Sequence, residues 1–261
     1  VNKSGRLITE RPLFYISLVT MLMGLIFFIA GFLGELILRS KKNGDNYSIV
    51  EKTKWPIMDS SEENFKVWSK KPFDQETIQE VHKLKKELNQ SDFNDIFYKN
   101  LEFGTGGMRG VMGVGPNRIN KYSLGKATQG ICNFINGLEI KNPKVIIGYD
   151  SRNNGKYLSK VVSDIFTANN IKTYIFDEIK PTPIISFGVR ELSCVCGIVI
   201  TASHNPPDYN GYKVYWSDGG QIVPPIDKKL IDSISRTNYN EINFAANNNL
   251  KTTDCNKIEK E

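Results

Sequence analysis

The sequence predicts an α/β fold, in which a three-layer α/β/α domain with a mainly parallel mixed sheet follows a transmembrane helix. Between residues 145 and 201, apolar runs rich in β-branched residues alternate with amphipathic segments at helical spacing. Short connections between alternating strands and helices favour a parallel sheet covered by helices on both faces. The second observation is an uncharged apolar run, Leu13–Gly34, because about 20 apolar residues span a bilayer as a helix.

The composition of the 261 residues is that of a globular protein with one or two domains, with 40% hydrophobic and 24% charged residues. The net charge of +6 comes from 34 basic and 28 acidic residues that are scattered along the chain. No nucleic-acid partner is expected from such a pattern, whereas anionic substrates such as sugar phosphates suit it. The four cysteines form no C-x-x-C pair and the chain has two histidines, so a zinc site is not expected.

The apolar run predicts a transmembrane helix over about residues 13–38, inside a segment of residues 1–50 that includes its polar flanks. Basic residues stand on both sides, among them Arg11 and Arg39, so the positive-inside rule does not orient the helix. A cleavable signal peptide is disfavoured because residues 31–35 lack a small-residue cleavage pattern. A buried core helix is the alternative interpretation.

Residues 51–99 are expected to form a linker and a helical lead-in to the domain. The polar stretch Lys41–Glu63 is typical of a linker. Asp74 is placed to cap a helix with apolar residues at near-helical spacing, and a second helix is predicted over 92–99. Three aromatic residues are expected to pack against the following domain: Trp55, Trp68 and Phe73.

A glycine-rich segment, L-E-F-G-T-G-G-M-R-G over residues 101–110, follows the lead-in. Its glycines let the backbone approach a ligand closely. Arg109 adds a planar guanidinium that grips phosphate through two parallel hydrogen bonds. We therefore expect Thr105, Gly106, Gly107 and Arg109 to bind phosphate, with a flexible turn as the alternative.

Predicted strands and helices then alternate along the chain, and polar residues follow the ends of the strands. Asp150 and Arg152 come directly after a strand and should share the carboxyl edge of the sheet with a later loop. A simple ion pair within the loop is the alternative to a catalytic role for them. The expected helices are 123–138, 156–169, 183–192 and 226–235, and the expected strands are 145–149, 172–176, 195–201 and 212–216.

The last of the buried strands runs into a loop that reads T-A-S-H-N-P-P from residue 201. Two prolines end regular structure there because neither donates a backbone hydrogen bond. Ser203 and His204 thus sit side by side beyond the end of a strand, where ligands bind in open α/β sheets. An ordinary turn serine is the alternative. Asn210-Gly211 predicts a tight turn, after which a returning strand carries Lys213.

The strings T-A-S-H-N-P and Y-N-G-Y-K resemble the phosphoserine loop of the α-D-phosphohexomutases, the phosphoglucomutase and phosphomannomutase family. The glycine-rich segment with Arg109 and the string G-Y-D-S-R are also similar to segments of that family. The resemblance implies that residues 100–225 form its N-terminal domain I. Residues 226–261 would then be a truncated interdomain segment, frayed at its end.

The resemblance implies an isomerase in which Ser203 carries a phosphoryl group between the 1 and 6 positions of a hexose phosphate. A sugar 1,6-bisphosphate is the intermediate and acts as the activator. Arg109 and Asn205 would hold phosphate, and Lys213 would serve as a cation or a proton shuttle. His204 would orient the nucleophile or assist proton transfer, with stabilisation of the loop as the alternative.

A magnesium ion is also implied, bound by one oxygen of phosphorylated Ser203. The family takes its other metal ligands from a D-G-D-x-D-R loop, and the sequence contains no such string. The resemblance therefore predicts that this chain alone has little or no mutase turnover.

The N-terminal segment has a resemblance of its own. Residues 10–36, within the segment 1–50, resemble the membrane tail of bacterial polyprenyl-phosphate glycosyltransferases. Because sugar phosphates are cytoplasmic, we expect a membrane-anchored protein with a cytoplasmic mutase domain, whose partners are the membrane and a hexose phosphate. The alternatives are a membrane-tethered, non-catalytic module that binds a phosphosugar or a partner, and a chimeric gene fragment.

Overall fold

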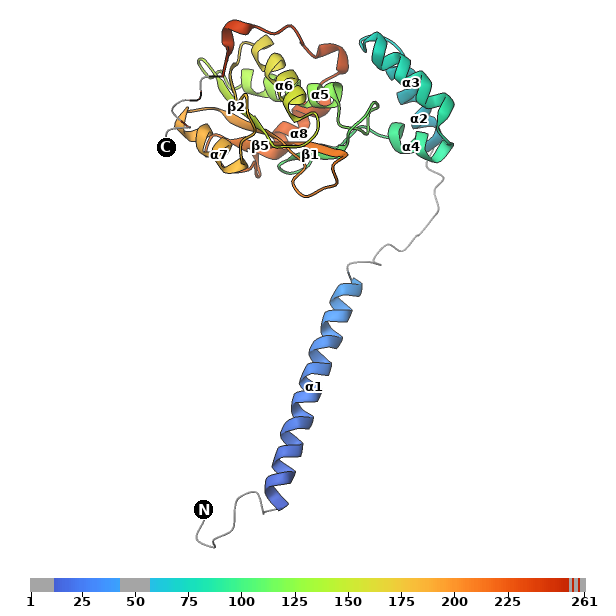
Figure 1. The fold of residues 1–261 in the computed structure, drawn as a ribbon, viewed down its shortest axis with the longest axis vertical. Helices are drawn as coiled ribbons and strands as arrows, with labels where there is room; N and C mark the ends of the chain where they lie inside the picture. Colours follow the sequence, from blue (N-terminus) through green and yellow to red (C-terminus); the bar gives the residue numbers. More distant parts are fainter. Residues whose placement is uncertain (1–11, 43–56, 254, 256–257, 259–261) are drawn as a thin grey trace. The chain divides into compact units, whose positions relative to one another are not determined.

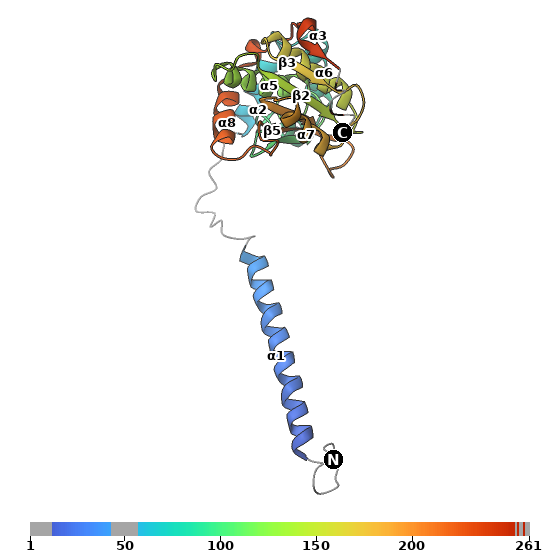
Figure 2. The same cartoon turned by 90° about the vertical axis from the view of Figure 1, so that its left-hand side faces the viewer.

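The computed structural model of the protein divides the chain into two compact units, which are described separately. The N-terminal unit contains one long helix, and the C-terminal unit contains the sheet and its covering helices (Figures 1 and 2). The two units are Val1–Trp55 and Pro56–Glu261, and the described residues are 12–42, 57–253, 255 and 258.

The long helix of the N-terminal unit is α1 (Pro12–Lys42). Its part Pro12–Leu36 has a mean hydropathy of 2.5 and is entirely unburied, and it is long and apolar enough to cross a membrane. The hydroxyls of Ser17 and Thr20 donate to carbonyls of the helix itself, at 2.8 and 3.0 Å. These polar groups are therefore satisfied without water, as a lipid environment requires. A helix over residues 13–38 is confirmed by α1, and its crossing of a membrane stays a prediction.

The C-terminal unit is built on a six-stranded sheet in the order β1-β5-β4-β2-β3-β6. Among these described strands, β5 runs antiparallel to both of its neighbours, while the pairs β4–β2, β2–β3 and β3–β6 are parallel. The predicted mainly parallel mixed sheet is therefore confirmed. Its strands are β1 (Gly107–Val111), β2 (Lys144–Tyr149), β3 (Lys172–Ile175), β4 (Cys196–Ile200), β5 (Tyr209–Trp216) and β6 (Lys251–Thr252).

Helices cover both faces of this sheet and complete the predicted three layers (Figure 1). Successive residues of a strand point to opposite faces. Ile147 accordingly joins the core under three of the helices, whereas Ile146 packs with Ile185 and Val189 of the fourth. The first three are α5 (Lys121–Asn136), α6 (Gly155–Ala168) and α8 (Ile226–Arg236), and the fourth is α7 (Thr182–Glu191).

Three lead-in helices pack onto the same core. Trp68 stacks on Phe73 with ring centroids 4.3 Å apart and meets the ring of Tyr122 of α5 at 5.9 Å. The carboxylate of Asp74 caps its helix by accepting the Thr77 N–H at 2.8 Å. The expected packing of Trp68 and Phe73 against the domain and the expected cap at Asp74 are therefore confirmed. Trp55 lies outside the described residues. The helices are α2 (Ile57–Trp68), α3 (Gln75–Glu87) and α4 (Gln90–Phe97).

The prediction of a polar linker over Lys41–Glu63 is wrong at both of its described ends. Residues 57–63 form the first turns of α2, and residues 41–42 close α1. Helix α2 is held because Phe65 meets the rings of Phe93 and Phe97 at 5.9 and 6.1 Å. A helix with one apolar face can begin with a polar turn, so composition alone misplaces its start.

The predicted tight turn at Asn210-Gly211 is also wrong, because both residues lie inside β5. Gly211 stands opposite Arg109 of β1. A Cβ atom on Gly211 would lie 2.7 Å from the carbonyl oxygens of Met108 and of Thr201. The glycine therefore permits close approach of backbones in the sheet and does not serve a turn.

The fraying expected at the end of the C-terminal segment falls on residues that lie mostly outside the described ones, whereas residues 238–253 pack onto the domain. Ile242 is buried, the Asn243 N–H donates to Gln129 at 3.1 Å, and Lys251 pairs with Asp164 at 2.8 Å. The segment also contains β6, which pairs with β3. Its anchors are mostly polar contacts, which a search for apolar periodicity does not detect.

Candidate functional site

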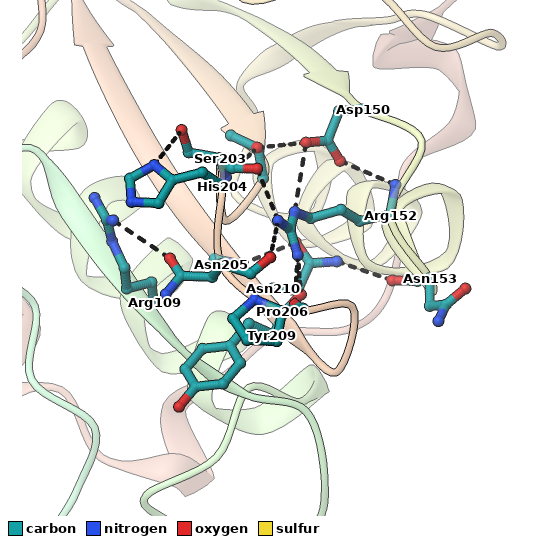
Figure 3. A network of polar contacts seen from close by, with 12 residues as sticks. Arg109, Asp150, Arg152, Asn153, Ser203, His204, Asn205, Pro206, Tyr209 and Asn210 are labelled. Atoms are coloured by element: carbon teal, nitrogen blue, oxygen red, sulfur yellow. Dashed lines mark hydrogen bonds and ion pairs between the residues drawn. The ribbon is translucent and has the colours of Figure 1, made fainter.

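Ser203 lies on the loop that connects β4 to β5, at the carboxyl edge of the parallel strands (Figure 3). Its side chain is exposed, and its Oγ lies 3.5 Å from Nδ1 of His204. The φ of Ser203 is 57°, in the left-handed region that residues with a side chain rarely adopt. Backbone strain of this kind is concentrated at functional sites. The hydroxyl is therefore presented to solvent from an unusual but fixed backbone.

The segment after β2 holds the serine loop through Asp150. Thr201 Oγ1 donates to Asp150 Oδ2 at 2.5 Å and accepts the Ser203 N–H at 2.9 Å. Asp150 Oδ1 also accepts the Arg152 N–H at 3.1 Å. Both Asp150 and Arg152 thus share the sheet edge with Ser203. Thr201 opens the string that resembles the phosphoserine loop, but sequence reasoning did not select it as a site residue.

Arg152 carries the ion pair that was the alternative interpretation, with Nε 3.8 Å from Asp150 Oδ2. It also donates to four backbone carbonyls of the serine loop, which sequence reasoning missed (Figure 3). Asn210 is a second missed residue. It is fully buried, and its Nδ2 donates to the Asn153 carbonyl at 2.9 Å. Its burial comes from the fold, and Asn210-Gly211 by itself predicts a turn, so the sequence offered no signal for this role.

Arg109 and Lys213 lie on one face of the sheet, since Arg109 stands opposite Gly211 and Lys213 opposite Gly107. The exposed Arg109 reaches the serine loop, where its Nη1 donates to Asn205 Oδ1 at 3.4 Å. Lys213 is half-buried, and its ammonium makes no hydrogen bond or ion pair with the described residues. Two basic side chains with unused donors therefore lie on the same face of β1 and β5.

The glycine-rich segment forms a tight turn before β1, closed by reciprocal backbone hydrogen bonds between Gly104 and Gly107 at 2.8 and 3.1 Å. Gly107 has φ 140°, and a Cβ there would lie 1.9 Å from the Tyr212 carbonyl oxygen. This glycine is thus required by the sheet itself. Thr105 is exposed and Gly106 is buried, and within the described residues no hydrogen bond joins either of them to the serine loop.

A small pocket of about 290 Å³ opens beside the serine. Its lining includes Asp150, Arg152, Ser203 and Asn205. A larger cleft of about 660 Å³ lies between α3 and the start of α5 and includes none of the predicted site residues. Among the residues that the structure describes, no group of three or more His, Cys, Asp or Glu could hold a metal ion. The chemistry available here is that of an exposed hydroxyl beside cations.

Known proteins resemble this chain over its C-terminal unit. A family model for the phosphoglucomutase/phosphomannomutase α/β/α domain I matches residues 100–258. A human phosphopentomutase is 36% identical over 166 residues, which are 60% of this chain and 27% of that protein. A phosphoglucomutase of Staphylococcus haemolyticus is 41% identical over 155 residues, which are 59% and 28%.

Among solved structures, one from Thermus thermophilus described as a phosphomannomutase is 27% identical, with a TM-score of 0.46. The match covers 56% of this chain and 31% of that one. The chain therefore spans less than a third of the length of each of these relatives. The family model nevertheless covers most of the chain, and the chain belongs to the phosphoglucomutase/phosphomannomutase family.

Proposed function

We propose that Ser203 is a phosphoryl carrier for a phosphohexomutase reaction, which moves a phosphoryl group between the 1 and 6 positions of a hexose phosphate. The observation that carries this proposal is the exposed Ser203 hydroxyl on a fixed loop that the Arg109 guanidinium reaches. Membership of the family supports it. Phosphoryl transfer depends chiefly on positioning and on compensation of negative charge, and this site offers both.

The proposed reaction has two half-steps. In the first, a sugar hydroxyl oxygen attacks phosphorus, the bond from phosphorus to Ser203 Oγ breaks, and the hydroxyl proton passes to a base. In the second, Ser203 Oγ attacks the other phosphoryl group of the bisphosphate, and the sugar oxygen leaves with a proton. The proposed partner for the serine proton is His204, whose Nδ1 lies 3.5 Å from Ser203 Oγ. Lys213 is the proposed cation or proton shuttle for the sugar hydroxyl.

The phosphate contacts are proposed for the residues around these groups. Arg109 stabilises the charge on the phosphoryl oxygens, because its donors are largely unused. Asn205 adds an amide on the same side of the loop. Thr105 and Gly106 would offer backbone N–H groups from the glycine turn. The Gly107 N–H is bonded to the Gly104 carbonyl, so the proposed contribution of Gly107 is the close backbone approach that a glycine permits.

Magnesium is proposed only through the phosphoryl group on Ser203, whose oxygens suit a hard cation. The described residues do not form a complete site for it, since they contain no cluster of metal-binding side chains. For that reason we propose that this chain alone has little or no mutase turnover.

We also propose that α1 anchors the protein in a membrane with the C-terminal unit in the cytoplasm, where hexose phosphates are found. The helix has the required length and hydropathy. The family model begins at residue 100, so the resemblance of residues 1–50 to a glycosyltransferase tail stays a prediction. The domain boundaries at residues 50, 99 and 225 likewise stay proposals.

Phosphorylation of Ser203 is the direct test. The full chain in detergent micelles is incubated with glucose 1,6-bisphosphate, and its intact mass is measured. We expect an increase of one phosphoryl group, lost in Ser203→Ala and retained in Ser217→Ala, an exposed serine in the turn after β5. No increase, or an increase that persists in Ser203→Ala, would reject the carrier role. A steady-state mutase rate of roughly 1 to 1000 per second from this chain would reject the proposed incompleteness.

A further inference from the structure

The guanidinium of Arg152 is directed at the backbone of the serine loop (Figure 3). Its Nη2 donates to the carbonyls of Ser203 and Asn205 at 2.7 and 2.5 Å, and its Nη1 donates to those of Pro206 and Tyr209 at 2.8 and 3.0 Å. A guanidinium has five N–H donors. Four of them are taken by these carbonyls, so little donor capacity remains for a ligand.

The loop needs such a partner because it satisfies only part of its own backbone. Pro206 and Pro207 have no N–H to donate, and the loop's internal backbone bonds are Asn205 N–H to the Ala202 carbonyl at 3.1 Å and Tyr209 N–H to the Pro206 carbonyl at 3.0 Å. Carbonyls left without a donor are unfavourable when they are shielded from water. Arg152 shields and satisfies them together, since its side chain is only 12% exposed.

The same arginine fixes the serine in its unusual conformation. The Ser203 carbonyl is held by Arg152, and the Ser203 N–H is held by Thr201 Oγ1, which in turn bonds to Asp150. Both backbone polar groups of Ser203 are therefore fastened to the segment after β2. A left-handed residue with a side chain persists only when its surroundings hold it there. The side chain of Ser203 remains exposed while its backbone is fixed.

Arg109 contrasts with Arg152 in both respects. It is exposed, and its one contact with the loop is a long one of 3.4 Å to a side-chain oxygen. Its remaining donors are unused by the described residues. Arg109 can therefore bind an anion, whereas Arg152 is occupied by the backbone of the loop.

We propose that Arg152 is a positioning residue, which holds the Ser203 loop in the conformation from which the phosphoryl group moves and does not itself bind phosphate. This inference rests on the proposed carrier role of Ser203. Lysine cannot replace Arg152, because a single ammonium lacks the planar fork that spans four carbonyls. Loss of Arg152 therefore slows phosphorylation at saturating bisphosphate, whereas loss of Arg109 raises the bisphosphate concentration needed.

Hydrogen exchange of the full chain in detergent tests the loop contact without any phosphoryl transfer. The matched control is Arg118, which is 14% exposed, donates to the carbonyls of Asp95 and Asn117, and pairs with the Asp95 carboxylate. We expect Arg152→Ala to speed exchange of the amides in residues 203–209 at least tenfold, and Arg118→Ala to leave them unchanged. Unchanged exchange in a folded Arg152→Ala chain would overturn the proposal.

Labelling kinetics supply the second readout, with the rate of Ser203 phosphorylation followed against glucose 1,6-bisphosphate concentration. We expect Arg152→Ala and Arg152→Lys to lower the maximal rate at least tenfold, with the half-saturating concentration within a factor of about two of wild type. A raised half-saturating concentration with normal exchange would make Arg152 a phosphate ligand and reject the proposal. If Arg152→Ala fails to fold, Arg152→Lys retains the charge and the stem and serves for both measurements.

The two proposals fail in different ways. Faster exchange in Arg152→Ala, combined with no labelling of the wild-type chain, would reject the carrier role of Ser203 and with it a positioning role in phosphoryl transfer. Labelling of the wild-type chain, combined with an Arg152→Ala chain that exchanges and reacts normally, would keep the carrier role and reject Arg152 alone.

Discussion

Arg109 of β1 reaches Asn205 of the serine loop, with its Nη1 3.4 Å from the Asn205 Oδ1. This is long for a hydrogen bond between a guanidinium and an amide oxygen. The contact joins the edge strand to the loop without using up the guanidinium. The arginine is therefore exposed, positioned and available to an anion.

Replacing Arg109 should affect phosphoryl chemistry much more than stability. A hydrogen bond to a charged group contributes about 1.5–3 kcal/mol, so Arg109→Ala should weaken bisphosphate binding roughly ten- to hundredfold in the labelling assay. The melting temperature should stay close to that of wild type, because the side chain is exposed. The affinity of Arg109→Lys for bisphosphate should lie between those of wild type and Arg109→Ala. A large drop in melting temperature would show instead that Arg109 is structural.

Replacing Lys213 should reduce labelling of Ser203 without lowering the free energy of unfolding. Its half-buried ammonium has no partner among the described residues, and burying part of an unpaired charge is unfavourable. Lys213→Met should therefore keep or raise the free energy of unfolding, by up to about 1 kcal/mol, while labelling of Ser203 falls. Lys228→Met on the exposed side of α8 is the matched control and should change neither quantity. A clearly destabilised Lys213→Met chain would contradict this.

The pair of Asp74 and Lys121 should make stability depend on pH in the acid range. Burial acts to raise the pKa of Asp74, but hydrogen bonds from Lys121, the Thr77 N–H and the Tyr122 hydroxyl outweigh it and lower the pKa below its usual value. The contribution of the carboxylate is therefore complete above its unfolded pKa of about 4. It is lost as the pH falls below that value toward the folded pKa.

Asp74→Asn tests this dependence while retaining a side chain that can cap α3. Urea unfolding should show the variant to be less stable than wild type at about pH 6, with the difference shrinking at about pH 3. Asp232→Asn removes an exposed ion pair with Arg236 on α8 and should have little effect at either pH. An equal difference at both pH values would mean that the Asp74 charge does not matter.

Gly211 should tolerate no side chain. A Cβ there would lie 2.7 Å from the carbonyl oxygens of Met108 and Thr201, and both of those are backbone atoms that cannot rotate away. Gly211→Ala should lower the free energy of unfolding by about 1–3 kcal/mol, the usual range for overpacking. Gly104→Ala is the control, since its Cβ would meet only one atom, at 3.7 Å. Equal losses in the two variants would argue against a specific clash.

The sequence predicted most of the alternating core but not the edges of the sheet. Strands β2, β3 and β4 were expected within about one residue of their bounds, because apolar β-branched runs in buried strands leave a clear pattern. Strand β1 was missed because glycine and arginine dominate it. Strand β6 has two residues, both polar, and pairs only because residues before it fold back over α6.

The sequence predicted those parts of the site that depend on neighbouring residues. It did not predict the contacts that the fold makes between distant segments. The end of an apolar strand and two prolines placed Ser203 beyond the sheet edge. The contacts of Arg152 with the loop could not be predicted, since four of its partners are backbone carbonyls that any sequence possesses. The approach of Arg109 to Asn205 depends on the pairing of β1 with β5, which lie far apart in the chain.

The two-residue strand β6 has a consequence for synthesis on the ribosome. It covers β3 on its outer side, and an uncovered strand edge invites pairing with other chains. As translation runs from the N-terminus, β3 emerges long before Lys251 does, and the apolar helix α1 emerges before both. The nascent chain therefore passes through a stage in which it carries an open β3 edge behind an exposed apolar helix, and a chaperone would be most useful in that interval.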